Sequence, residues 1–391
     1  MAIKRKIKMP TPFWDSDLTN IILDLEKLRF KELYSELPPH IFFQLKEIFQ
    51  ILETLGSARI EGNNTTLPEY VEKIIEKKTK KDEKQIEIEN IEKAIKFIEK
   101  NTSQNTKFDR GYISELHKII TNKLTPPPDG EGSNYPGDLR RCNVGIKKSN
   151  HRPPDYAVLQ DYFDEFIEVI NGDHREQNQL LMVAIAHHRF KYIHPFDNGN
   201  GRMGRLLNYA FLIKLGFQVK RGRIINPSSV FYVDRDKYCD MLSVADSLRD
   251  EDVLRWAEYF LLGLKNETEK IDGLLNREYV VEKVLSPTID IALERENITN
   301  REHRILSYLI RREGVVMMSK DLSEIGIDDS VQKSRIMRRL KDKKIIRPIK
   351  RGGRVYTINF VNNYLLRGVI KSLENEGFVS DFLNKNTSNN S

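Results

Sequence analysis

The sequence predicts a mainly α-helical protein with a small module of three helices and a β-hairpin near its C-terminal end. Apolar residues recur at helical spacing in most long segments, as in EKQIEIENIEKAIKFIEK, where four isoleucines mark one face. β-like signals are short and few. From about residue 296 the chain changes to short helical stretches followed by IRPIKRGGRVYTINF, which is typical of a hairpin that turns at two glycines.

The elements are expected in the following order. Two N-terminal helices are separated at Pro38-Pro39, because proline removes a backbone donor and clashes with the preceding turn. A further helix follows GSARIEGNNTTLPEY, and Asp109 is placed to cap RGYISELHKIITNKL. TPPPDGEGSNYPG can only form a loop. DLRRCNVGIKKSNHRPP carries the β-like signal of the middle region and is expected to form a small hairpin.

These patterns divide the chain into five parts. They are an N-terminal helical region (1–108), a helical core (109–265), a helical linker (266–295), a winged helix-turn-helix (296–360), and a C-terminal helix with a tail (361–391). The last residues, NKNTSNNS, are polar throughout and are expected to be disordered.

Positive charge gathers in the predicted winged helix-turn-helix. Residues 300–360 hold 16 Lys and Arg against 7 Asp and Glu, whereas the whole chain has a net charge of only +7. A polyanionic partner is therefore expected at this module, with DNA binding and protein contacts as open alternatives. The basic residues singled out are Arg335, Arg338, Arg339, Lys341, Lys343 and Lys344 on the predicted recognition helix, and Lys350, Arg351 and Arg354 on the wing.

Several classes of protein are excluded by composition. No apolar run approaches the roughly 18 residues of a membrane-spanning helix. The basic start, MAIKRKIKMP, has no apolar segment behind it, which argues against a secretory signal. The two cysteines are too few for a disulfide framework. The sequence thus predicts a cytoplasmic protein without a membrane partner.

Most candidate site residues lie in one stretch, YIHPFDNGNGRMGRLLNYAF, which contains two overlapping patterns. GNGRMG fits the spacing of a dinucleotide-binding turn, which needs a strand before it and an acidic residue about 20 residues later. A helical pattern precedes it here, and the downstream segment FQVKRGRIINP has no acid. We therefore reject the dinucleotide interpretation.

The alternative is an anion hole between two helices. Gly199 and Gly201 let a phosphate approach the main chain closely, and the N–H groups of the following helix point at it. Asn200 can add an amide. Arg202 and Arg205 lie one turn apart, so both guanidinium groups are expected to face the same pocket.

A histidine stands just before this cradle. As a neutral imidazole, His194 can take a proton from a hydroxyl group that attacks a phosphorus atom. The alternative role is a structural histidine at a helix end. The glycine turn and the two arginines beside it favour the chemical role.

HPFDNGNGRMGR resembles the signature of Fic-domain proteins, H-P-F-x-(D/E)-G-N-G-R-x-x-R. AHHRFKYIHPF, YPGDLRRCNV followed by HRPP, and DRDKYCDML are also similar to the family, and the resemblance covers roughly residues 50–265. It implies a Fic-type helical core at 109–265 with the hairpin as a flap that docks the target. The implied activity is transfer of AMP from ATP, with Mg²⁺, to a Tyr, Thr or Ser hydroxyl of a protein target, self-modification included. Self-association as a homodimer is also implied.

The resemblance assigns roles to individual residues. His194 would be the general base, and Phe196 would anchor the loop in the core. Asn200 and the backbone around Gly199 and Gly201 would bind the α-phosphate. The same resemblance assigns the β- and γ-phosphates to Arg202 and Arg205.

Two positions depart from the family pattern. Asn198 stands where the pattern has the Asp or Glu that coordinates Mg²⁺, and a neutral amide oxygen is a weaker ligand for this cation than a carboxylate. In YCDMLSVAD, Tyr238 is the expected nucleotide-binding residue, but Cys239 follows it and Asp246 stands where Asn is usual. These departures put the metal ion and the recognised base in question.

SARIEG resembles the inhibitory motif (S/T)-x-x-x-E-(G/N) of the family, in the N-terminally inhibited type. A carboxylate at Glu61 that reaches Arg205 would form a charge-assisted pair and occupy the guanidinium that must hold the γ-phosphate. Ser57, one turn earlier, could bond in the same pocket. The alternative is a plain helix end with Gly62 as its cap.

The favoured function is therefore an autoinhibited protein adenylyltransferase. A DNA-binding regulator whose Fic core only senses a nucleotide is the alternative from another class, and Asn198 keeps it open. A third alternative is an enzyme that transfers a different nucleotide moiety, from UTP or a choline-bearing nucleotide.

Overall fold

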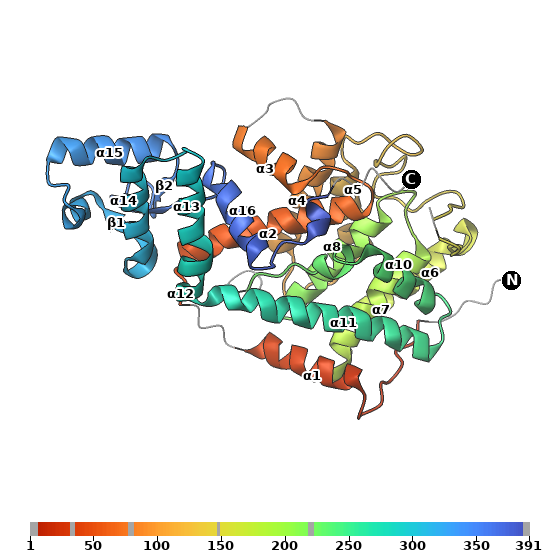
Figure 1. The fold of residues 1–391 in the computed structure, drawn as a ribbon. Helices are drawn as coiled ribbons and strands as arrows, with labels where there is room; N and C mark the ends of the chain where they lie inside the picture. The colour runs from red at the N-terminus through yellow and green to blue at the C-terminus, as the bar shows by residue number, and fades with distance from the viewer. Residues whose placement is uncertain (1–6, 32–35, 77–81, 147–148, 218–222, 386–391) are drawn as a thin grey trace.

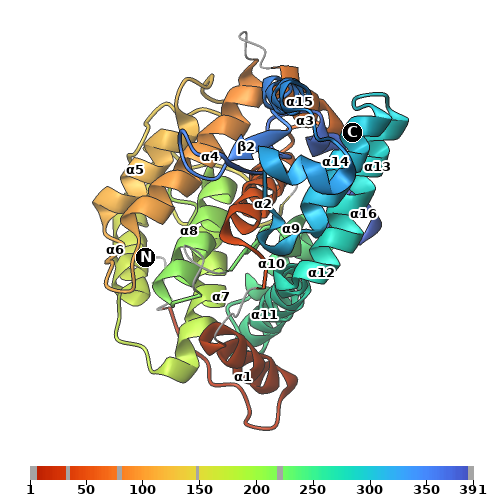
Figure 2. The same ribbon diagram turned by 90° about the vertical axis from the view of Figure 1, so that its left-hand side faces the viewer.

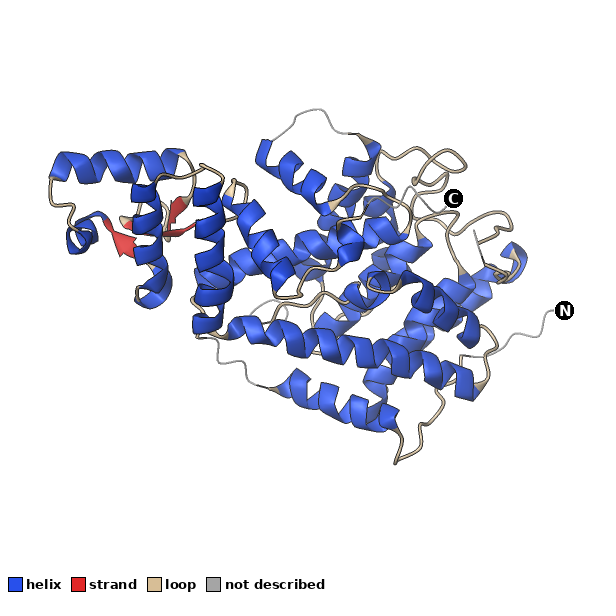
Figure 3. Cartoon of the chain, viewed as in Figure 1, coloured by secondary structure: helices blue, strands red, loops and turns tan. Residues whose placement is uncertain are grey.

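The computed structural model describes residues 7–31, 36–76, 82–146, 149–217 and 223–385 (Figure 1). Over these residues the protein is mainly helical, as predicted, and its strands form one small sheet (Figure 3). No described helix combines the length and the apolar character needed to cross a membrane.

Two buried helices form the centre of the larger part of the molecule. α7 (Glu176–Ile193) and α8 (Asn200–Lys214) pack against each other, and residues 180–190 and 200–213 are all buried. A helix that is buried on every side belongs in a core rather than on a surface. The helices around this pair are α1 (Asp17–Phe30), α2 (Pro39–Ile60), α3 (Leu67–Glu76), α4 (Glu83–Asn101), α5 (Arg110–Thr121), α6 (Leu159–Ile170), α9 (Ser229–Tyr232), α10 (Arg235–Ala245) and α11 (Asp250–Asp272).

Local signals in the sequence set several of these helix ends. α2 begins at Pro39, where the missing N–H of proline costs nothing. Asp109 caps α5 by accepting a hydrogen bond from Tyr112 N at 2.8 Å. α11 continues to Asp272, so the predicted division at 265/266 falls inside a helix.

The predicted flap hairpin does not form in the described residues 138–146 and 149–155, which contain no strand. Side chains hold the segment instead of a ladder of backbone bonds. Arg140 donates from Nη1 to the carbonyl of Cys142 at 2.9 Å and from Nη2 to that of Pro154, and Asn143 Nδ2 donates to Asp155 at 2.9 Å. Arg140 thus satisfies two backbone carbonyls that would otherwise need a partner, and the segment is held without strand pairing.

The last third of the chain forms a module at one end of the molecule, which faces the viewer in Figure 2. Helices and a small sheet alternate here, and the winged helix-turn-helix stays a prediction. Strand β3 (Val355–Ile358) lies between β1 (Met317–Met318) and β2 (Ile346–Pro348), and both pairs are antiparallel. The second predicted helix is a 3₁₀ run, Ser319–Ile325, and the strand before it was not predicted. The elements from residue 277 onward are α12 (Arg277–Tyr279), the π-helical turn Val280–Leu285, α13 (Ser286–Glu294), α14 (Asn300–Arg311), β1 (Met317–Met318), α15 (Ser330–Asp342), β2 (Ile346–Pro348), β3 (Val355–Ile358) and α16 (Leu365–Asn375).

The chain then returns to the helical core. After α16, a short 3₁₀ turn, Asp381–Leu383, lies against α2. Asn384 Nδ2 donates to Glu374 Oε1 at 2.8 Å, and Lys385 N donates to Asp381 O at 3.2 Å. The predicted disordered tail, 384–391, is therefore wrong for its first two residues, while 386–391 lie outside the described residues.

Candidate active site

The loop between α7 and α8 is fixed at both of its ends. α7 ends at Ile193 and is capped by His194, whose backbone is left-handed (φ 51°, ψ 61°) and whose N–H donates to Phe190 O at 3.0 Å. Phe196 is 1% exposed, and its ring stacks on His117 with centroids 3.8 Å apart. Phe196 thus anchors the loop in the core, which orients the histidine just before it.

α8 begins at Asn200 with Gly199 as its N-cap, and the loop folds back on this start. Gly199 has φ +76°, a conformation that a residue with a side chain adopts at a cost. Asn200 Oδ1 accepts from Phe196 N at 2.9 Å, and its Nδ2 donates to Phe196 O at 2.8 Å. The amide of Asn200 therefore fixes the loop itself. A glycine cap has no side chain to bond the first-turn N–H groups of α8, which leaves them for an anion.

A carboxylate lies over this helix start. A Cβ atom built on Gly201 would stand 1.8 Å from Glu61 Oε1, so nothing larger than hydrogen separates the glycine from that carboxylate. The same oxygen lies 2.9 Å from Arg205 Nη2. Burial alone would raise the pKa of Glu61, but Arg205, Lys191 and Arg202 together lower it to about 2. Glu61 is therefore an anion at any physiological pH.

Arg205 is held almost entirely by the last turn of α2. Its Nε donates to Ser57 Oγ at 2.9 Å and its Nη2 to Ser57 O at 2.8 Å, and the side chain is 1% exposed. Nη1 is buried and bonds to none of the described residues. Ser57, Glu61 and Arg205, which the inhibitory motif links, thus lie together. Gly62 follows the end of α2 with φ +111°, in accord with the predicted cap.

Arg202 is held by different carboxylates. Its Nη1 lies 3.1 Å from Glu87 Oε1 on α4, and its Nη2 lies 2.9 Å from Glu131 Oε2. Nη2 also donates to Glu131 O at 2.8 Å, and the side chain is fully buried. The two arginines thus have different partners here, although both of their charges act on Glu61, and their shared pocket stays a prediction. Nothing in the local spacing indicated Glu87 or Glu131.

His194 is an uncharged imidazole. Burial and the nearby ammonium group of Lys191 lower its pKa to about 3. Nδ1 lies 3.4 Å from Lys191 O, a distance that favours a proton on Nδ1 and leaves Nε2 as the acceptor. Arg140 steadies the loop by donating from Nε to His194 O at 2.9 Å. A neutral histidine with a free ring nitrogen can accept a proton from a hydroxyl group.

The predicted nucleotide-binding Tyr238 lies inside the core, not on an open wall. It is 2% exposed, and its hydroxyl oxygen lies 2.9 Å from His187 Nε2. Burial raises its pKa well above the usual range. Asp246, the other position that departs from the family pattern, is 3.0 Å from His188 and 3.7 Å from His151. Both residues support neighbouring side chains in this structure.

The residues at the expected metal position do not suit Mg²⁺. Asn198 Oδ1 accepts from Gly199 N at 2.7 Å, and its Nδ2 donates to Gly130 O at 3.1 Å. The carboxylate of Asp197 is bonded by Ser133 Oγ and Asn134 N. Among the described residues, no three His, Cys, Asp or Glu side chains gather to hold a metal ion. A cation that prefers several free carboxylate oxygens finds none here.

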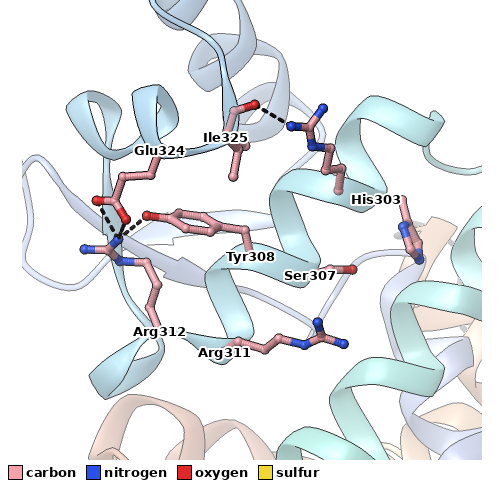
Figure 4. Close-up of a pocket in the computed structure, with 8 residues that line it drawn as sticks. His303, Ser307, Tyr308, Arg311, Arg312, Glu324 and Ile325 are labelled. Carbon is pink, nitrogen blue, oxygen red and sulfur yellow. Dashed lines mark hydrogen bonds and ion pairs between the residues drawn. The ribbon is translucent and has the colours of Figure 1, made fainter.

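A cavity of about 580 Å³ lies elsewhere, in the C-terminal module, between α14 and the 3₁₀ run that follows β1 (Figure 4). Two of its arginines are already bonded. Arg312 Nη1 is 3.0 Å from both carboxylate oxygens of Glu324, and Arg304 donates to Ile325 O at 2.7 Å. The predicted site residues lie at the α7–α8 loop and not in this cavity.

The fold and the site define a helical protein with a glycine-capped helix start between two buried helices and a neutral histidine beside it. Residues 107–212 match the model of the Fic/DOC family, and the chain therefore contains a Fic/DOC domain. The match begins just before α5 and ends within α8, so it includes the histidine, the cradle and both arginines.

Curated relatives include the protein adenylyltransferases Fic of Drosophila virilis and Drosophila melanogaster. Each is 30% identical over 198 residues, which are 49% of this chain and 36% of the relative. The chain thus matches about a third of the length of these relatives.

Two solved structures are similar to the chain. A Fic family protein from Desulfovibrio desulfuricans G20 has a TM-score of 0.55 at 19% identity, covering 90% of this chain and 98% of that one. A Fic domain containing signaling protein from Bacteroides thetaiotaomicron has a TM-score of 0.52 at 16% identity, covering 66% and 98%. At such identities the likeness is one of fold.

Proposed function

We propose that the protein is an autoinhibited adenylyltransferase, which transfers AMP from ATP to a Tyr, Thr or Ser hydroxyl of a protein, itself included. The observation that carries the proposal is the position of Glu61. Its carboxylate lies over Gly201 at the start of α8 and 2.9 Å from Arg205, where a bound phosphate would be expected. The relatives named protein adenylyltransferase support a transferase of the Fic type.

The cradle has the features that a triphosphate needs. The N–H groups at the start of α8 suit the α-phosphate, and Gly201 provides the space, since a Cβ atom there would meet the carboxylate of Glu61 that now lies over this helix start. Arg205 Nη1 is a buried donor that bonds to no described residue. Once Glu61 withdraws, Arg205 can hold the γ-phosphate. Arg202 becomes available for the β-phosphate when Glu131 releases it.

The proposed reaction uses His194 as the general base. The target oxygen attacks the α-phosphorus, its proton passes to Nε2 of the imidazole, and the bond to the β-phosphate oxygen breaks to release pyrophosphate. A histidine whose pKa lies near 3 is unprotonated at pH 7 and therefore ready to accept this proton. No step is assigned to a metal ion, because Asn198 and Asp197 offer no free carboxylate.

The test is labelling with ATP that carries the label on its α-phosphate. Glu61→Gly should incorporate on the order of 10²-fold more label than the wild type, since it frees the arginine that must hold the γ-phosphate. Adding His194→Ala should remove the gain. Glu115→Gly, at an exposed glutamate of α5, is the matched control and should behave like the wild type.

Three results would contradict the proposal. Equal labelling of wild type and Glu61→Gly would reject inhibition by this carboxylate. Label that persists after His194→Ala would reject the general base. Label taken only from UTP or from a choline-bearing nucleotide would assign a different donor.

A DNA-binding regulator is a second candidate, favoured by one observation. Arg335, Arg338 and Lys341 on α15 are exposed, as are Lys350, Arg351 and Arg354 between β2 and β3. Arg339 and Lys343, by contrast, are bound to the buried carboxylate of Glu302 at 3.0 and 2.8 Å. The exposed set suits contacts to phosphates of duplex DNA.

Fluorescence anisotropy with duplex DNA at rising salt tests this candidate. Binding should weaken steeply as salt rises, because phosphate contacts release counterions. The double variant Arg335→Glu with Arg338→Glu should weaken binding at least tenfold, because it removes two such contacts. Arg339→Gln, which alters an arginine that is paired inside the module, is the control. If no labelled nucleotide gives incorporation of label while duplex DNA binds tightly, the regulator is favoured over the enzyme.

A further inference from the structure

The last turn of α2 has two opposite faces. Ser57 and Glu61 are four residues apart and lie on the same side of the helix, toward Arg205. Arg59 lies between them in sequence, and successive residues of an α-helix are rotated by about 100°. Its side chain therefore leaves α2 on the side away from the cradle.

On that side, Arg59 is bound by backbone carbonyls from two segments. Its Nε and Nη2 donate to Phe382 O at 3.1 and 2.8 Å, and Nη2 also donates to Lys385 O at 2.5 Å. Nη1 donates to Thr65 O at 2.7 Å. The guanidinium carbon lies 5.1 Å from the centroid of the Phe382 ring. Two of the three carbonyls thus come from the C-terminal segment, which we define as residues 378–385.

This arginine is buried and bonded by carbonyls. Arg59 is 2% exposed, and the hydrogen bonds described for it go to backbone carbonyls. Burial lowers its pKa from the usual value, while the charge of Glu69 acts in the opposite direction. A buried cation is costly unless its donors are satisfied. The position of Arg59 therefore depends on the carbonyls of the C-terminal segment.

Aromatic packing joins the same segment to the same helix turn. Phe382 stacks on Tyr232 with centroids 6.0 Å apart and planes 11° apart. Tyr232 in turn lies directly against Gly56 of α2, where an added Cβ atom would stand 2.3 Å from two ring atoms. Phe378 packs edge-on against Phe49, which lies nearer the middle of α2 than Gly56. The segment therefore covers α2 over its C-terminal half.

The other end of α2 is bonded to the C-terminal module. Gln44 is fully buried; its Nε2 donates to Ile358 O, and its Oε1 accepts from Phe360 N, both at 3.0 Å. Arg347 of β2 donates to His40 O at 3.2 Å. Figure 1 shows α2 running from this module into the middle of the molecule. The helix that carries Glu61 is thus held at both ends by the last third of the chain.

We propose that Arg59 is a positioning residue for inhibition and that the C-terminal segment is the intramolecular ligand that holds it. The segment keeps the last turn of α2 seated, and the seated turn places Glu61 over the cradle. A partner that displaces the segment would let the turn move and would free Arg205. The inference rests on the proposed function, whose site it regulates.

The test uses the full chain and two readouts, label incorporated from α-labelled ATP and the Kd for ATP measured by calorimetry. Arg59→Gln should raise labelling about tenfold and lower the Kd by a similar factor, since it removes several hydrogen bonds of a charged group. Arg59→Lys should give a smaller rise. Combined with Glu61→Gly, Arg59→Gln should add nothing further. Arg367→Gln is the control, because Arg367 of α16 bonds Glu72 of α3 and not α2.

A role in stability alone predicts a different pattern. Folded Arg59→Gln with labelling and Kd at wild-type values would overturn the proposal, as would a loss of labelling in the Glu61→Gly background. If Arg59→Gln fails to fold, Phe382→Ala replaces it and should raise labelling about threefold by removing the ring contacts. Wild-type behaviour of folded Phe382→Ala would then overturn the proposal.

The two hypotheses fail separately. If Glu61→Gly takes no label from any nucleotide, the proposed transfer is wrong, but the Kd for ATP still reports whether Arg59 controls access to the cradle. If Glu61→Gly is labelled and tightens the Kd while Arg59→Gln does neither, only the role of Arg59 is wrong.

Discussion

The α7–α8 loop and the last turn of α2 meet at one site, but they are held by different means. The loop is bonded within itself and by other residues of the same core: Asn200 bonds Phe196, four residues away, and Arg140 donates to His194 O. The turn of α2 is held by distant residues. Ser57 bonds Arg205, 148 residues away, and Arg59 bonds Phe382, 323 residues away.

This difference separates a part that binds from a part that can be moved. A loop fixed by itself and by the surrounding core is expected to keep its shape when the C-terminal segment moves. A helix turn fixed by remote segments changes position when those segments do, and a few kcal/mol of differential binding suffice to shift such an equilibrium. The anion cradle is therefore expected to persist in the active state, while the position of Glu61 is expected to change.

The largest expected effect comes from filling the cradle. Gly201→Ala should abolish activity, by about 100-fold or more, in both the wild-type and the Glu61→Gly backgrounds, because its Cβ atom takes the space of the anion. Labelling with α-labelled ATP measures this. Gly204→Ala in the same helix is the matched control, since its Cβ atom would meet His187 at an ordinary 3.5 Å. Activation by Gly201→Ala would show that expelling Glu61 is enough and that the cradle tolerates the methyl group.

A smaller effect is expected at Asn198. In the Glu61→Gly background, Asn198→Asp should raise Mg²⁺-dependent labelling about tenfold, because a carboxylate is the ligand that this cation prefers. Comparing rates with Mg²⁺ and with a chelator measures the gain. Asp197→Asn is the control: it should lower activity by weakening the bonds from Ser133 and Asn134 without changing the metal dependence. An unchanged metal response of Asn198→Asp would mean that the cation site lies elsewhere.

Sequence alone could predict the parts that depend on near neighbours. Helical periodicity, the break before Pro39 and the cap at Asp109 were predicted and are present. The GNG turn, with Gly199 in a left-handed conformation, follows from local backbone chemistry. The pair between Glu61 and Arg205 was anticipated only through the resemblance to Fic-domain proteins, because spacing within α2 does not reveal what its end touches.

The remaining features depend on contacts that no local pattern encodes. Glu87 and Glu131 hold Arg202, although both lie more than 70 positions from it in the sequence. The predicted flap hairpin was wrong because Arg140 satisfies the carbonyls that a strand partner would bond. Polar composition predicted disorder at Lys385, yet its carbonyl accepts a bond from Arg59.

The smallest expected effect is a loss of folding stability in mild acid. It acts on the loop through His117 and not on the pair of Glu61 and Arg205. Burial lowers the pKa of His117 to about 4, and its geometry agrees: Nδ1 accepts from Gly137 N at 2.9 Å, and Nε2 lies 3.1 Å from Asn198 O. A proton on Nδ1 would break the first bond. Because the folded pKa lies below the unfolded value of 6.5, the unfolded state binds more protons as pH falls, and stability is lost from about pH 6.5 downward.

For His117 this loss should reach about 2 kcal/mol at pH 5, whereas Glu61, with a pKa of about 2, stays charged and paired until far lower pH. Urea unfolding at pH 7 and pH 5 measures it, and His117→Gln should reduce the difference. His303, a partly exposed residue of α14 that pairs with Asp290, is the control site. If His303→Gln reduced the difference as much as His117→Gln, acid sensitivity would not be a property of the loop. Mild acid would then no longer distinguish the cradle, which is held from within the core, from the carboxylate of Glu61, which is held through the C-terminal segment.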